Sequence, residues 1–134
     1  MNITLYNRQR KVRLALPRLQ RLAQAALSAV LPLRTALPEV EVTFLSDAAI
    51  ARVHRDFMGV PGATDVITFD HGEILISPET ARVNAWQYGR PLEEELARYI
   101  VHGLLHLKGY EDKTPTDCAR MHQLQEEILA GCLR

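Results

Sequence analysis

Two histidines placed four residues apart in an apolar stretch constrain this chain more than any other feature. His102 and His106 lie within the run 101–108, and residues i and i+4 of an α-helix share one face, one turn apart. Gly109 follows the second histidine by three residues, where a helix can end in a left-handed turn. The chain can then fold back and present Asp112 to the same point. This spacing offers two nitrogen ligands and one oxygen ligand, and three protein ligands leave a fourth position for water, as in catalytic zinc sites.

The surroundings of the histidine pair decide between a metal site and a coincidence of spacing. Buried imidazoles need partners for their polar nitrogens, and a metal ion supplies them. Peptidases of the zincin type carry a glutamate directly after the first histidine, as His-Glu-x-x-His. Gly103 takes that position here, which favours metal binding but not peptidase chemistry. The neighbours that indicate a largely buried helix are Leu96, Tyr99, Ile100, Leu104, Leu105 and Leu107.

The third ligand has two candidates in the sequence. Asp112 lies just beyond the glycine turn, whereas His122 lies inside a predicted last helix that could pack near the pair. A helix interior delivers a ligand less directly than the turn, which favours Asp112. A divalent ion held there would lower the pKa of a bound water and could polarise a carbonyl or phosphoryl oxygen.

Composition and length predict one soluble α/β domain spanning residues 1–134. Hydrophobic residues make up 47% of the chain and charged residues 24%, which is ordinary for a globular protein with a real core. No apolar run reaches the length of a membrane span, and residues 1–16 lack the pattern of a signal peptide. We therefore expect a cytoplasmic protein. Cys118 and Cys132 are too few for a disulfide framework, so we expect packing roles for both.

The net charge is zero, but positive charge gathers at the start of the chain. This basic segment can lie along a phosphate backbone, or acidic neighbours can offset it in the fold. A separate arginine, Arg55, is a candidate for phosphate contact, because a planar guanidinium donates two hydrogen bonds to phosphate oxygens. The alternative for Arg55 is a surface ion pair. Residues 1–38 contain no acidic residue and seven basic ones: Arg8, Arg10, Lys11, Arg13, Arg18, Arg21 and Arg34.

Hydrophobic periodicity and turn residues predict alternating strands and helices. The turn 70–72 is expected to join two strands as a hairpin, with a loop at 59–63 before them. This order indicates an α/β (α+β) fold with a small mixed sheet of about four strands packed with about five helices. Strands are predicted at 3–6, 39–45, 64–69 and 73–76, and helices at 17–30, 47–58, 78–88, 91–108 and from 115 onward, the last with Ala119, Leu124, Ile128 and Leu129 toward the core.

Three sequence blocks resemble the YbeY family of bacterial metal-dependent endoribonucleases, which act in rRNA maturation and ribosome quality control. The family run His-Gly-x-Leu-His-Leu-x-Gly-Tyr-Asp-His compares with residues 102–112, which read His-Gly-Leu-Leu-His-Leu-Lys-Gly-Tyr-Glu-Asp. An arginine followed by Thr-Asp-Val-Leu-Ser-Phe compares with Arg55 and residues 64–69, which read Thr-Asp-Val-Ile-Thr-Phe. A Gly-Asp-Ile strand start compares with Gly-Glu-Ile at 72–74. The blocks share the family's order, and the resemblance extends over about residues 40–130.

The resemblance implies a zincin-like domain with one Zn²⁺ per chain on His102, His106 and Asp112, and a catalytic role for Arg55 at the RNA. It implies a single-strand-specific endoribonuclease that acts on rRNA of the small ribosomal subunit, at the 3′ end of 16S rRNA. Neither DNA nor a membrane is an expected partner, and the oligomeric state is left open. The family's third histidine falls on Asp112, whose negative charge would make the ion less Lewis-acidic or the site weaker.

Because Asp112 replaces the family's third histidine, two other functions remain alternatives. One is a ribosome-associated binding module whose metal is structural or weakened. The other is a metal-dependent hydrolase of another class, which Gly103 makes less favoured. Metal content measured together with cleavage of RNA separates all three.

Overall fold

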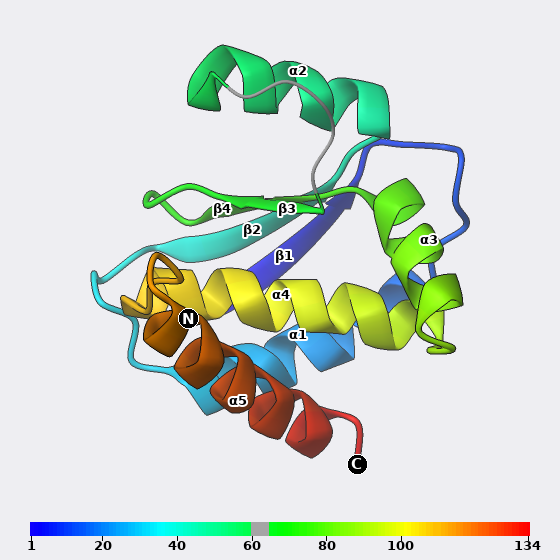
Figure 1. Cartoon of the computed structure of the whole chain (residues 1–134). Coiled ribbons are helices and arrows are strands. Elements are labelled where there is room, and N and C mark those ends of the chain that lie inside the picture. The colour runs from blue at the N-terminus through cyan, green and yellow to red at the C-terminus, as the bar shows by residue number, and fades with distance from the viewer. Residues whose placement is uncertain (60–64) are drawn as a thin grey trace.

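The computed structural model describes residues 1–59 and 65–134 and contains a mixed sheet with helices on both faces (Figure 1). The predicted loop at 59–63 and the first residue of the strand predicted at 64–69 fall largely outside the described part. In chain order, the elements are β1 (Asn2–Asn7), α1 (Leu16–Val30), β2 (Glu39–Phe44), α2 (Asp47–Met58), β3 (Val66–Thr68), β4 (Glu73–Ile76), α3 (Pro78–Gln87), α4 (Leu92–Lys108) and α5 (Pro115–Cys132).

The sheet has the strand order β1-β2-β4-β3. The strands β1, β2 and β4 run parallel to one another, and β3 returns antiparallel along the outside of β4. The predicted mixed sheet and the predicted hairpin are therefore confirmed. Gly72 turns the hairpin with φ +106°, a conformation that favours glycine. A Cβ there would also lie 3.0 Å from the carbonyl oxygen of Glu39, so the turn packs closely against the start of β2.

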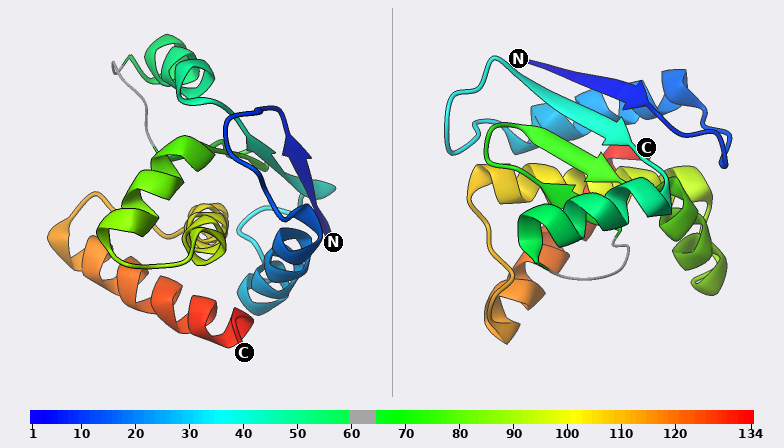
Figure 2. Two further views of the ribbon diagram at one scale, coloured as in Figure 1. Left: turned by 90° about the vertical axis from the view of Figure 1, so that its right-hand side faces the viewer. Right: turned by 90° about the horizontal axis from the view of Figure 1, so that it is seen from above.

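Helices cover the two faces of the sheet unequally. Helix α2 lies alone over one face, whereas α1 and α4 pack on the other, with α5 beyond them and α3 at one end (Figures 1 and 2). The main core fills the space between the sheet and this helical layer, and Phe44, Ile74, Leu104 and Leu105 are fully buried in it. Among the described residues, no helix has the length and apolar character that crossing a bilayer requires.

Helix α4 is the centre of the helical layer and carries both histidines. Three glutamates occupy its first turn, where negative charge is favourable at the positive end of the helix dipole. Its last turn ends on Gly109, which adopts the left-handed conformation with φ +113°, as the sequence predicted. Apolar residues point to the sheet, α1 and α5, so most of the helix is buried. A helix packed on all these sides is a rigid base for side chains at its surface.

The predicted core face of α5 is right for Leu124, Ile128 and Leu129 but wrong for Ala119. The packing role expected of the two cysteines is right for Cys132 and wrong for Cys118. Ala119 is exposed, whereas Met121 and Gln125 are buried together with Leu129, so the core-facing stripe runs through positions four residues apart. Cys118 is exposed instead of packed, and its Sγ donates to the carbonyl oxygen of Asp112 at 2.9 Å. The error in α5 arises because a polar residue takes a buried position, which hides the helical period from a hydrophobicity count.

Candidate metal centre

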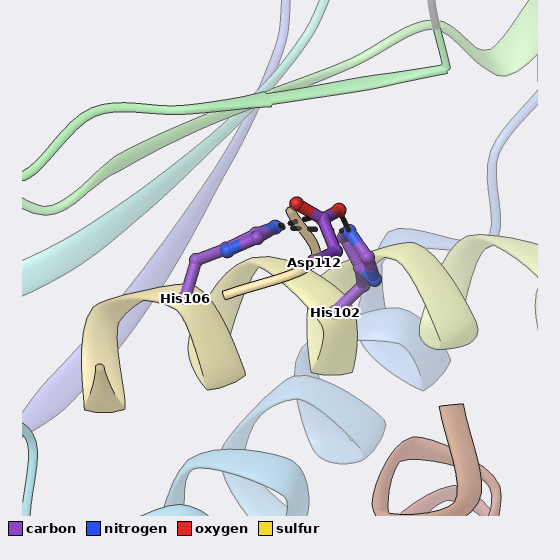
Figure 3. Close-up of side chains that lie close together, drawn as sticks. All are labelled: His102, His106 and Asp112. Carbon is purple, nitrogen blue, oxygen red and sulfur yellow. Dashed lines mark hydrogen bonds and ion pairs between the residues drawn. The ribbon is translucent and has the colours of Figure 1, made fainter. Parts of the chain in front are cut away.

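Three side chains meet at one point beside the C-terminal half of α4. His102 and His106 rise from adjacent turns of the helix, and Asp112 returns to them from the loop after Gly109 (Figure 3). The two Nε2 atoms lie 3.1 Å apart, and Oδ2 of Asp112 lies 3.8 Å from His102 Nε2 and 3.6 Å from His106 Nε2. The structure thus brings together the three residues that the sequence proposed as ligands.

The spacing of these three atoms fits a tetrahedral metal ion. Zinc–nitrogen and zinc–oxygen bonds of about 2.0–2.1 Å at tetrahedral angles place two ligand atoms roughly 3.3 Å apart. The three observed separations, 3.1, 3.6 and 3.8 Å, lie on both sides of that value. Both imidazoles are half-buried and the carboxylate is more exposed, which leaves one side of the group open to the solvent.

The other nitrogen of each imidazole is held by an acceptor. His106 Nδ1 lies 3.0 Å from the carbonyl oxygen of Tyr110, which can only accept, so this Nδ1 carries the proton. His102 Nδ1 lies 2.8 Å from Oε1 of Gln125. The amide of Gln125 is oriented by Glu126, because its Nε2 donates to a carboxylate oxygen at 3.1 Å. Both rings are therefore assigned the tautomer whose Nε2 is free to bind a metal.

These tautomers leave two lone pairs facing each other. In the tautomers that carry the proton on Nδ1, neither Nε2 can donate across the 3.1 Å gap. Two lone pairs at this distance repel unless a cation lies beside both, and Asp112 adds negative charge on the same side. Burial holds the pKa of His102 below its usual value, which disfavours a proton as that cation. The arrangement therefore suits a metal ion.

A buried polar network anchors Gln125 and, through it, His102. Arg98 donates to both oxygens of the Glu126 carboxylate, from Nε at 2.9 Å and from a terminal nitrogen at 3.0 Å. Its other terminal nitrogen donates to Glu95, which also accepts from Tyr99. These hydrogen bonds link α4 to α5. The guanidinium holds the pKa of the Glu126 carboxyl below its usual value, mainly through its hydrogen bonds, so the acceptor of the Gln125 amide stays charged.

A cleft of about 520 Å³ opens over the three candidate ligands. Its described walls come from the connection after α1, from α2, from β3 and from the loop after α4. Four carboxylates line it, from Asp65, Asp70, Glu111 and Asp112. The edge strand β3 and the three candidate ligands thus face one open space.

Two residues singled out by sequence are not part of the three-residue group. His122 is exposed on α5 and lines a smaller pocket with His102 and Asp112, but it is not one of the three candidate ligands. Arg55 lies on α2 with its side chain 62% exposed and its Nε 3.2 Å from Oδ1 of Asp56. It is not among the described residues that line the cleft. Its catalytic role remains a prediction from the resemblance.

Sequence reasoning missed Gln125, whose side chain fixes the tautomer of His102. The available signal was a polar residue at a core position of the last helix, between Met121 and Leu129. A buried amide needs partners, and such a residue inside an apolar stripe is a candidate for a structural or functional hydrogen bond.

Gly103 has a packing role that also explains the absence of a zincin glutamate. A Cβ at this position would lie 2.8 Å from Cδ1 of Ile74 and 3.0 Å from its Cγ2. Any side chain here would force Ile74 or the helix to shift, so glycine lets α4 pack this closely on β4. The residue after the first histidine therefore faces the sheet instead of the cleft.

Comparisons with known proteins identify the family of this chain. The family model described as "Endoribonuclease YbeY" matches residues 4–132. A protein named Endoribonuclease YbeY from Bacteroides thetaiotaomicron is 39% identical over 101 residues, which cover 70% of this chain and 74% of that protein. One of the same name from Moorella thermoacetica is 40% identical over 112 residues, covering 69% of this chain and 72% of the relative.

Another relative is much longer, and one solved structure shares the fold. The Endoribonuclease YbeY of Myxococcus xanthus is 38% identical over 104 residues, but the matched part spans only 35% of its length. The solution structure of TM1509 from Thermotoga maritima superimposes with a TM-score of 0.69 at 24% identity, covering 98% of this chain and 89% of that one. At that identity, the structural match supports the fold alone. The family model and the curated relatives together show that the chain belongs to the Endoribonuclease YbeY family.

Proposed function

We propose that this chain is a zinc-dependent endoribonuclease that cleaves single-stranded RNA. Its expected substrate is the rRNA of the small ribosomal subunit near the 3′ end of 16S rRNA, in the cytoplasm. The proposal assigns the ligand roles to His102, His106 and Asp112, with one Zn²⁺ per chain. Membership of the Endoribonuclease YbeY family supports the reaction class, and the triad in the cleft supports the metal.

The observation that carries the proposal is the pair of Nε2 atoms that face each other at 3.1 Å beside the Asp112 carboxylate. Hydrogen bonds to Gln125 and Tyr110 direct both Nδ1 protons away from the centre. A structural histidine pair has no need of this arrangement, which is unfavourable without a cation. When bound, zinc supplies Lewis acidity and lowers the pKa of a water.

The protein residues contribute position and charge to that chemistry. Helix α4 holds both imidazoles at fixed separation, and Asp112 completes the donor set from a loop whose start is fixed by Gly109. The carboxylate lowers the net charge of the centre, so a bound ion is a weaker Lewis acid than one on three neutral ligands. The cleft leaves the open side of the centre facing β3, where an extended strand of RNA has room.

The test is zinc content and RNA cleavage in paired variants. His102→Ala should lose bound zinc, measured by elemental analysis, and should lose cleavage of a single-stranded RNA oligonucleotide. His122→Ala is the control, because that histidine is exposed and lies outside the triad, and it should keep both. Cleavage of RNA without cleavage of a peptide substrate would separate the nuclease from another metal-dependent hydrolase.

Two results would contradict the proposal. Wild-type protein that binds zinc and RNA but leaves RNA intact would support the ribosome-associated binding module. Equal zinc content in wild type and His102→Ala would remove the histidine pair from the metal site.

A further inference from the structure

We propose that Arg34 is a phosphate-binding residue of the cleft and contacts the backbone of single-stranded RNA beside the metal centre. The inference rests on the proposed function and adds a substrate contact to it. Arg34 belongs to the basic first segment of the chain, in the connection between α1 and β2, and lines the same cleft as the three candidate ligands.

The backbone around Arg34 is fixed to the end of the helix that carries both histidines. Its N–H donates to the carbonyl oxygen of Leu107 at 3.1 Å, and Leu107 is the residue after His106. Lys108 Nζ donates to the carbonyl oxygens of Val30 and Pro32, at 2.6 and 2.9 Å. Position 34 is thus held relative to α4 by its own backbone hydrogen bond and by those of two residues before it.

The stem of Arg34 lies over the glycine that ends α4. A Cβ at Gly109 would lie 3.5 Å from Cδ of Arg34 and 3.9 and 4.0 Å from its Cβ and Cγ, all ordinary contacts. The three stem carbons therefore lie beside the turn that leads to Asp112, and the side chain starts at the mouth of the cleft that it lines.

The charges in the cleft leave the guanidinium of Arg34 available. Of the two long cationic side chains that line the described walls, Lys113 forms an ion pair with Glu111 at 3.8 Å. Within the residues that the structure describes, the Arg34 side chain forms no hydrogen bond or ion pair. Four carboxylates oppose a polyanion here, so RNA needs a cation besides the metal, and a guanidinium fits two oxygens of one phosphate.

Arg55, the arginine expected from the family resemblance, is placed differently. It pairs with its neighbour Asp56, and its side chain is 62% exposed on α2. A contact of Arg55 with RNA and a contact of Arg34 with RNA are compatible, because Arg55 lies on α2 and Arg34 lies in the connection between α1 and β2. The geometry of the described residues gives Arg34 the position nearer to the ligand helix.

The experiment compares Arg34→Gln with Arg34→Lys and Arg21→Gln. Glutamine keeps Cβ, Cγ and Cδ, the atoms that pack over Gly109, so the melting temperature and zinc content should stay at wild-type values. Binding is measured by anisotropy with a phosphorothioate RNA oligonucleotide, which resists hydrolysis, across a series of salt concentrations. Cleavage is measured with ordinary single-stranded RNA. Arg21 is an exposed cation of the same basic segment, on α1, and does not line the cleft.

Arg34→Gln should weaken binding and lower kcat/KM by roughly tenfold to a hundredfold, the effect of losing a charge-assisted hydrogen bond. The slope of log K against log salt should shrink by about 0.7, one phosphate contact on a single strand. Arg34→Lys should keep the slope but recover only part of the affinity, because lysine lacks the bidentate fork. Arg21→Gln should match wild type.

Unchanged slope and affinity in Arg34→Gln, with an active wild type, would overturn this inference alone. A wild type that binds the oligonucleotide without cleaving RNA would overturn the proposed function, and the salt slope would still decide the role of Arg34. A wild type that neither binds nor cleaves RNA would overturn both.

Discussion

Replacing Gln125 with leucine tests whether the metal centre depends on the tautomer of His102. Leucine has nearly the same volume, so the buried position stays filled, but His102 Nδ1 loses the acceptor that lies 2.8 Å away. The ring can then rotate or carry its proton on Nε2, which must be removed before a metal binds. Loss of such a supporting hydrogen bond lowers metal affinity by about 10–100-fold, which corresponds to about 1.4–2.8 kcal/mol.

The stability of the metal-free protein should change less than its zinc affinity. An unsatisfied buried N–H costs about 1–3 kcal/mol, but burial of leucine at a position only 6% exposed offsets part of that. We therefore expect a small shift in the melting temperature without zinc and a large shift in zinc affinity. The two quantities are measured by thermal unfolding in chelator and by zinc competition with a chromophoric chelator.

Two further variants make the result interpretable. Gln123→Leu makes the same substitution on the exposed side of the same helix and should leave zinc affinity unchanged. Gln125→Glu keeps an acceptor for His102 but places a second carboxylate where the amide donates to Glu126 at 3.1 Å. It should bind zinc at least as well as wild type and be less stable without it. If Gln125→Leu and Gln123→Leu bind zinc equally, the orientation of His102 does not depend on Gln125 and the reasoning fails.

Asp112→Ala should lose zinc affinity, whereas Asp112→His should retain zinc with a pH–rate profile that rises at lower pH, because a neutral ligand leaves the ion more acidic. Similar zinc affinity in Asp112→Ala and wild type would exclude Asp112 as a ligand. Gly103→Ala should lower the free energy of unfolding by about 1 kcal/mol, because overpacking of about 1–3 kcal/mol exceeds the helix-propensity gain of about 1 kcal/mol. Gly131→Ala, with no atom within 4 Å of its Cβ, should instead be neutral or stabilising by urea titration. Hydrogen bonds from Arg98 lower the pKa of Glu126 in the folded protein, so the charged carboxylate stabilises the fold above the unfolded pKa of 4.5. This stabilisation is lost as the pH falls below 4.5 and the carboxylate takes up a proton. Glu126→Gln should therefore make the free energy of unfolding less dependent on pH in the acid range. Parallel pH–stability curves for Glu126→Gln and wild type would contradict this linkage.

The sequence predicted the elements well where a local signal marks both ends. The helix through His102 and His106 could be bounded from Pro91 and Gly109, and the structure places it at Leu92–Lys108. The hairpin followed from one turn signal, because neighbouring strands joined by a tight turn have little choice of partner. The strand order, in which β4 lies between β2 and β3, depends on long-range pairing and was not predicted.

The proximity of His102, His106 and Asp112 was predictable because they lie within eleven residues of each other, with one helix and one turn between them. The positions of Gln125 and Arg34 could not be predicted in this way. Each depends on contacts between distant elements, Gln125 on the contact of α5 with α4 and Arg34 on a backbone hydrogen bond to Leu107. No period or spacing in the sequence encodes those contacts.

The close approach of α4 to β4 at Gly103 limits which catalytic side chains substitution can introduce beside His102. A Gly103→Glu change would write His-Glu-x-x-His into the sequence, the motif that peptidases use to place a general base. In space, that side chain would start 2.8 Å from Ile74, inside the layer between helix and sheet. The carboxylate would have to be buried, or the helix would have to move away from the sheet and carry His102 with it. One substitution is thus enough to change His-Gly-x-x-His into the peptidase motif His-Glu-x-x-His. A working general base at this position would also require a rebuilt interface between α4 and the sheet.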